Sequence, residues 1–156
     1  TVFSNAALDV TKKNGRETLR LPTLGKEEKI STDELRRMQI AKIHFLLLDA
    51  RNKKNYEIEH IAGALLPLSF QYYEELEFYK SHPQAAKPDL DKALMEEMRK
   101  YPRDDPAVVY CGRNCKVSAI LSSKLKYLGF KNVKVMEEGL PGWKERGYPT
   151  RKGLMP

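Results

Sequence analysis

The chain has 156 residues, of which 41 % are hydrophobic and 31 % charged, so it has the size of about one globular domain and lies outside the disordered class. Its longest apolar stretch, residues 61–68, is far below the ~18–20 residues that span a bilayer, so we expect no membrane span. The net charge is +7, and this whole excess lies in residues 111–156, which hold ten basic and three acidic residues.

The first half of the chain predicts an arm, a helix and a buried strand. Residues 1–29 are polar and show no sustained periodicity, so we expect an N-terminal arm or an irregular lead-in. A helix is predicted over about 31–41, because Ser31 provides an N-cap and Glu34 stands three residues later, as in a capping box. The apolar run 45–48 predicts a strand buried on both faces.

Two further segments precede the middle of the chain. Residues 64–68 are a second strand candidate, which Pro67 restricts to a strand end or an edge. Aromatic residues between 72 and 79 have roughly helical spacing, a pattern that usually faces a core, and we assign no chemistry to them. A helix then starts at Pro88 and ends before Pro102.

In the second half, strands and helices alternate. Residues 107–110 and 133–136 are short apolar runs that predict buried strands. Between them, the apolar positions 117–128 line one side of a helix, with Gly129 placed just past its end. A short helix from 141 is closed by Gly147. The alternation predicts an α/β domain over residues 30–150, with a mostly parallel central sheet, helices on both faces and a C-terminal tail at 151–156.

The cysteine loop follows a predicted strand and precedes a predicted helix. Ligands of parallel sheets bind at the carboxyl ends of the strands, where Asp49 and Cys111 are expected. The turn from Gly112 to Lys116 directs backbone N–H groups inward as an anion nest, and Arg113 and Lys116 add positive charge. These surroundings favour a thiolate at Cys111 that attacks an anionic substrate. A buried structural cysteine is the alternative.

Four stretches resemble motifs of the rhodanese homology domain, in the family's order. The loop 111–116 has that family's length, a cysteine, four residues and a basic residue, although the family most often has Arg where this chain has Lys116. The other stretches are Leu48-Asp49-Ala50-Arg51, then Tyr56 with Glu59-His60-Ile61-Ala62-Gly63-Ala64, and Glu138-Gly139-Leu140-Pro141-Gly142-Trp143 with Gly147-Tyr148-Pro149. Glu59 and Ala62 depart from the family pattern. The resemblance covers about residues 31–150 and implies a rhodanese-like fold.

The resemblance also implies a sulfurtransferase. Cys111 would take the outer sulfur of thiosulfate or a similar small anionic donor, hold it as a persulfide and pass it to a thiol or cyanide acceptor. No cofactor is implied, and no metal-ligand spacing is present. The expected substrate-binding residues are Gly112, Arg113, Asn114, Cys115, Lys116 and Val117, with loop N–H groups stabilising the persulfide and Arg113 and Lys116 anchoring the donor. Asp49, Arg51 and His60 are expected to be structural, and Trp143 to pack in the core.

Several alternatives remain open at this stage. Cys115 could attack the persulfide, release sulfide and leave a disulfide, or it could be a small apolar filler that points away. A non-catalytic rhodanese-like binding module is a third reading. Phosphatase loops on a similar scaffold are one residue longer, which disfavours that activity, and aromatic residues are too few among the basic ones for nucleic-acid binding.

The compartment and the oligomeric state are also open. Because the chain starts at Thr1, we expect a processed or trimmed product, either cytoplasmic or periplasmic. In an oxidising compartment the redox alternative for the two cysteines gains weight.

Overall fold

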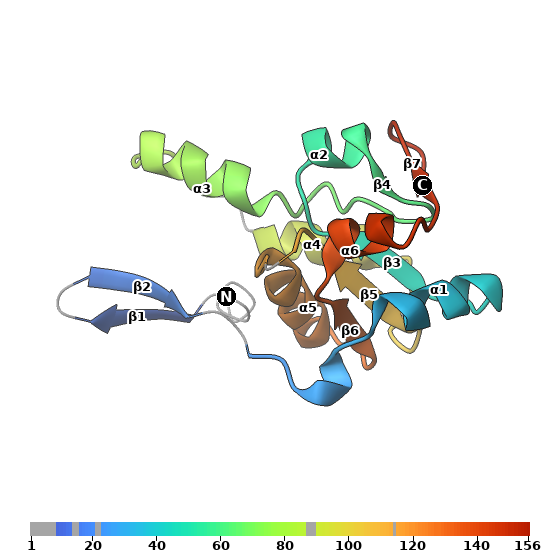
Figure 1. Cartoon of the computed structure of the whole chain (residues 1–156). Helices are drawn as coiled ribbons and strands as arrows, with labels where there is room; N and C mark the ends of the chain where they lie inside the picture. Colours follow the sequence, from blue (N-terminus) through green and yellow to red (C-terminus); the bar gives the residue numbers. More distant parts are fainter. Residues whose placement is uncertain (1–8, 14–15, 21–22, 87–89, 114) are drawn as a thin grey trace.

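A computed structural model describes residues 9–13, 16–20, 23–86, 90–113 and 115–156. At its centre lies a parallel sheet of three strands in the order β3-β5-β6 (Figure 1). The strands are β3 (Leu46–Asp49), β5 (Ala107–Tyr110) and β6 (Val133–Met136). Single parallel bridges extend the sheet at both edges, Leu65 beside β3 and Lys29 beside β6. The predicted α/β fold with a mostly parallel sheet is confirmed.

Helices cover both faces of this sheet because successive strand residues point to opposite sides. Leu46, Leu48 and Val109 pack in the core beneath α4 (Leu90–Met98) and α5 (Val117–Tyr127). Leu47, Val108 and Tyr110 pack on the opposite face, and the helices there are α1 (Thr32–Ile40), α2 (Lys53–Ile58) and α6 (Gly139–Glu145). Trp143 of α6 is fully buried in this second core, as expected.

Most predicted boundaries hold within two residues. The Ser31 hydroxyl accepts the N–H of Glu34 at 3.1 Å, so α1 begins where the capping residue predicts. Gly129 follows α5 with a φ of 104°, the left-handed conformation that glycine adopts freely. The last helix begins at Gly139, two residues earlier than expected. Residues 64–68 contribute only the single bridge at Leu65 instead of a full strand.

The lead-in to the domain contains regular structure that we did not expect. Strands β1 (Asp9–Lys13) and β2 (Arg16–Arg20) pair antiparallel, with Lys12 opposite Glu17. A short 3-10 helix, η2 (Lys26–Glu28), follows. The hairpin is drawn outside the α/β body in Figure 1.

The expectation that the aromatic residues at 72–79 face the core is only partly right, because Tyr72 packs against the core whereas Phe78 does not. They form α3 (Tyr72–Ser81), which extends away from the sheet in Figure 1. Phe78 is 48 % exposed, and its ring stacks on His82 with centroids 4.4 Å apart. The helical spacing is real, but the Phe78 ring contacts Tyr79 and His82 outside the core.

The C-terminal segment returns to the domain. Strand β7 (Thr150–Arg151) pairs antiparallel with β4 (His60–Ile61), and the N–H of Gly153 donates to the carbonyl of Glu57 at 2.7 Å. The segment that we predicted as a tail is thus hydrogen-bonded to the domain. Over the described ranges, no helix combines the length and apolar character that crossing a membrane requires.

Candidate active site

Cys111 lies at the carboxyl edge of the central sheet. Strand β5 ends at Tyr110, Cys111 follows directly, and α5 begins six residues later at Val117. The cysteine is 1 % exposed and belongs to the core beneath α5. The same edge carries Asp49 at the end of β3, beside Tyr110 in the parallel register. The two strand ends singled out in the sequence are therefore neighbours.

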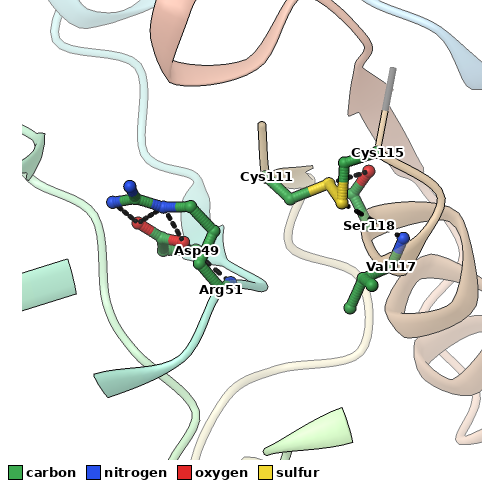
Figure 2. The surroundings of a disulfide bond; sticks show 6 residues. All are labelled: Asp49, Arg51, Cys111, Cys115, Val117 and Ser118. Atoms are coloured by element: carbon green, nitrogen blue, oxygen red, sulfur yellow. Dashed lines mark hydrogen bonds and ion pairs between the residues drawn. A yellow bond between two sulfur atoms is a disulfide. The ribbon is translucent and has the colours of Figure 1, made fainter. Parts of the chain in front are cut away.

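Cys111 and Cys115 form a disulfide, drawn in yellow in Figure 2. Their Cα atoms are 6.1 Å apart, within the usual range for this bond. The turn after β5 thus brings residues four positions apart into bonding distance. The Cys115 side chain therefore points toward Cys111, and the prediction of an apolar filler that points away is wrong.

Each sulfur receives one hydrogen bond from the start of α5. The Ser118 Oγ lies 3.2 Å from the Cys111 Sγ, and because a disulfide sulfur carries no proton, the hydroxyl is the donor. The N–H of Val117 donates to the Cys115 Sγ at 3.4 Å. The N–H of Cys115 instead closes the turn onto the carbonyl of Gly112, at 3.4 Å. Val117 and Ser118 therefore direct their donors at the sulfurs.

The two basic residues of the loop, Arg113 and Lys116, lie in different surroundings. Arg113 is exposed and pairs with the Glu145 carboxylate of α6 at 2.6 Å. This hydrogen bond raises the pKa of Arg113 and lowers that of Glu145. Lys116 is exposed at the last position before α5. Asn114 lies outside the described residues.

A buried ion pair supports the loop from the neighbouring strand. Asp49 is fully buried, and Arg51 binds its carboxylate through Nε at 3.0 Å and Nη2 at 2.8 Å (Figure 2). The Tyr110 hydroxyl donates to the same carboxylate at 2.7 Å and accepts the N–H of Ile61 at 3.0 Å. Burial and the charge of Asp49 raise the pKa of Tyr110 well above its ordinary value. Tyr110, which directly precedes Cys111, is thereby hydrogen-bonded to both β3 and β4.

His60 is buried, and its hydrogen bonds and ring contact are with residues other than the two cysteines. Its Nδ1 lies 2.8 Å from the carbonyl of Tyr56, and its Nε2 lies 2.7 Å from the carbonyl of Met155. Its ring stacks on Tyr56 with centroids 3.7 Å apart. These contacts tie the C-terminal segment to α2, which is a structural arrangement.

Gly139 lies directly against the backbone of the cysteine loop and was not among the predicted site residues. Its φ is 62°, and a side chain there would collide with the carbonyl of Cys111 and the backbone of Gly112. The next N–H, of Leu140, donates to the Cys111 carbonyl at 3.0 Å. Ser118 and Glu145 were missed as well. Two of the three had a signal in the sequence. The first turn of a helix faces the loop before it, which points to Ser118, and Gly139 lies in a stretch that resembles a family motif.

Comparisons with known proteins agree with this geometry. A family model described as rhodanese-like domain matches residues 31–146. No curated protein sequence matches the chain. The solved structures described next are 19–22 % identical to this chain, so the likeness in each concerns the fold.

The rhodanese-like domain of the Alr3790 protein from Anabaena sp. is 19 % identical, with a TM-score of 0.60, over 82 % of this chain and 81 % of that one. Human single domain sulfurtransferase TSTD1 is 22 % identical, with a TM-score of 0.53, over 76 % and 96 %. Thiosulfate sulfurtransferase from Pseudomonas aeruginosa is 20 % identical, with a TM-score of 0.55, over 91 % of this chain and 22 % of that one.

Proposed function

The chain belongs to the rhodanese-like domain family, and from this premise we propose that it is a sulfurtransferase that carries sulfur on Cys111. The observation that carries the proposal is the place of Cys111, between the end of β5 and the start of α5, with a hydroxyl donor 3.2 Å from its sulfur. The names of two similar structures, both sulfurtransferases, support it. We take residues 30–150 as the catalytic unit.

In the proposed reaction the reduced Cys111 thiolate attacks the outer sulfur of thiosulfate or a similar donor. A sulfur–sulfur bond forms at Cys111, the donor's own sulfur–sulfur bond breaks, and sulfite leaves with the electron pair. A thiol or cyanide acceptor then removes the outer sulfur and returns the thiolate. The Ser118 hydroxyl and the amino end of α5 favour negative charge on the Cys111 sulfur.

Room for the donor exists on the loop itself. Among the described residues other than Gly112 and its two chain neighbours, no atom lies within 4 Å of the point where a side chain at Gly112 would begin, which leaves space for a ligand beside the backbone there. Arg113 and Lys116 are both exposed and are the candidates for holding the anionic end of the donor. The Glu145 carboxylate holds Arg113 in place and partly offsets its charge. We therefore assign the larger electrostatic share to Lys116.

A second route is favoured by one specific observation, the Cys111–Cys115 disulfide. In this route the Cys115 thiolate attacks the inner sulfur of the Cys111 persulfide. The Cys115–Cys111 bond forms, the persulfide bond breaks, and hydrosulfide leaves with the electron pair. The disulfide is then reduced by two equivalents of thiol, which end as an external disulfide. The net products are sulfide and oxidised thiol instead of an acceptor persulfide.

The intact mass of the reduced protein after incubation with thiosulfate tests both routes. We expect a gain of one sulfur that is absent in Cys111→Ser. In the second route the wild type loses two hydrogens and releases sulfide, while Cys115→Ser keeps the added sulfur as a stable persulfide. If wild type and Cys115→Ser both retain the sulfur equally, the second route is excluded. An unchanged mass in every variant refutes thiosulfate as donor.

A further inference from the structure

The two sulfurs of the disulfide differ in their access to solvent. Cys111 is 1 % exposed, whereas Cys115 is partly exposed and lines a cavity of about 310 Å³. Cys111 is not among the residues that line this cavity. The volume falls at the lower end of the range for small-molecule sites. A nucleophile from solvent therefore meets the sulfur of Cys115 first.

The cavity carries a net positive charge. Lys29, Glu137 and Lys116 all line it, and the first two form an ion pair at 3.2 Å. Lys116 has no carboxylate at ion-pair distance in the part of the chain that the structure describes. One positive charge thus remains uncompensated beside Cys115, and it attracts an anion.

We propose that this cavity receives a thiol bearing an anionic group, and that the thiol reduces the disulfide by attack at Cys115. This inference rests on the proposed function, because it concerns the step that regenerates the Cys111 thiolate. The thiolate of the ligand bonds to the Cys115 sulfur, the Cys115–Cys111 bond breaks, and Cys111 leaves as thiolate. A second thiol then attacks the mixed disulfide, forms an external disulfide and frees Cys115.

The surroundings of the sulfurs support this direction of attack. The leaving Cys111 thiolate forms next to the Ser118 hydroxyl, which donates to it at the distance already present in the disulfide. Negative charge on a departing sulfur strengthens that hydrogen bond. In the oxidised protein, attack at Cys111 would instead require a thiol to reach a sulfur that the core encloses.

The test compares rates of reduction of the oxidised protein by thiols of different charge. The probes are 3-mercaptopropionate, which is anionic, 2-mercaptoethanol, which is neutral, and cysteamine, which is cationic. Each rate is calculated per thiolate and divided by the rate at which the same thiol reduces hydroxyethyl disulfide, which corrects for its intrinsic reactivity. We expect the anionic thiol to be favoured over the cationic one. Lys116→Gln should lower that preference by about seven-fold, because a charge roughly 7 Å away in water changes the rate of each charged thiol by about three-fold, in opposite directions for the two. The preference should also fade at high salt.

Lys131→Gln is the matched control, because it removes the same charge at the opposite end of β6, where Lys131 pairs with Asp104. It should leave the preference unchanged. With an alkylating agent present during limited reduction, peptide mapping should place the thiol adduct on Cys115 and the alkyl group on Cys111. An adduct on Cys111, or rates that ignore thiol charge, would overturn the inference.

Sulfur loading is measured separately, so the two proposals fail in different ways. A protein that loads sulfur on Cys111 but is reduced without charge preference refutes the cavity assignment and keeps the proposed function. A protein that shows the charge preference but acquires no sulfur from any donor refutes the proposed function alone.

Discussion

The Tyr110 hydroxyl joins the residue before Cys111 to the buried carboxylate of Asp49. It donates to that carboxylate at 2.7 Å and accepts the N–H of Ile61 at 3.0 Å, and all three residues are fully buried. A hydrogen bond to a charged group contributes about 1.5–3 kcal/mol, and a buried N–H without a partner costs about 1–3 kcal/mol. Because Arg51 still binds the carboxylate after the change, we expect Tyr110→Phe to lower the free energy of unfolding by about 3 kcal/mol.

Tyr56→Phe is the matched control. The Tyr56 hydroxyl is also buried but makes one neutral hydrogen bond, to the carbonyl of Ala64 at 2.6 Å. Its loss should cost about 1 kcal/mol. Urea unfolding with the disulfide intact, followed by the fluorescence of the single, fully buried Trp143, measures both variants. If the two variants lose the same free energy, the carboxylate contact does not stabilise the strand end as argued.

Four further predictions concern the loop and its supports. Arg51→Met should lower the free energy of unfolding by about 3–5 kcal/mol, because it leaves the buried Asp49 carboxylate without its cation. Urea unfolding measures this change. A loss no larger than that caused by replacing an exposed arginine would contradict the prediction. Gly139→Ala should lower the free energy of unfolding by about 1–3 kcal/mol and slow sulfur loading, because the new methyl group collides with the loop backbone. Gly147→Ala is its control, since Gly147 has a similar φ of 69° and open space around it, and it should leave sulfur loading unchanged. Reducing the disulfide should lower the unfolding free energy by about 2 kcal/mol, the chain-entropy value for so short a loop; an equal urea midpoint before and after reduction would refute it. The Arg113 hydrogen bond lowers the pKa of Glu145, so the stability from this pair is present above the unfolded-state pKa and disappears as pH falls through the folded-state pKa. Glu145→Gln should therefore be destabilising at neutral pH and neutral in effect in acid, as stability curves at low salt would show.

The central sheet was predictable because its strands have no exposed face. Residues of β3 and β5 are buried on both sides, so the sequence there is a continuous apolar run. The cap of α1 and the glycine after α5 are local signals of the same kind. The short elements α2 and β4 were not expected. A helix of six residues is too short to show a period, and β4 pairs with a strand about ninety residues further on.

The site could be predicted in part from the same local signals. A cysteine between a buried strand and a helix marks the carboxyl edge of the sheet, and this is where Cys111 lies. The contact between Tyr110 and Asp49 spans 61 positions, and the one between Arg113 and Glu145 spans 32. No local pattern reports such pairs, which depend on strand order and on where α6 begins. The state of Cys115 was undecided for a related reason, since the spacing alone does not give the direction of the turn.

The position of Cys115 bears on which product leaves the protein. In the reduced state its sulfur is tethered to Cys111 by a four-residue turn, and tethering over short distances corresponds to effective concentrations of about millimolar or above. An external acceptor has to exceed that concentration, and also has to reach a sulfur bonded to a cysteine that is 1 % exposed. The effective concentration of the tethered thiol and the burial of Cys111 both favour attack by Cys115 over attack by a dilute acceptor. In the proposed reaction, a second cysteine at this position thus favours the second route, in which sulfide leaves and a thiol reductant is needed, whereas serine at this position favours a persulfide that waits for an acceptor.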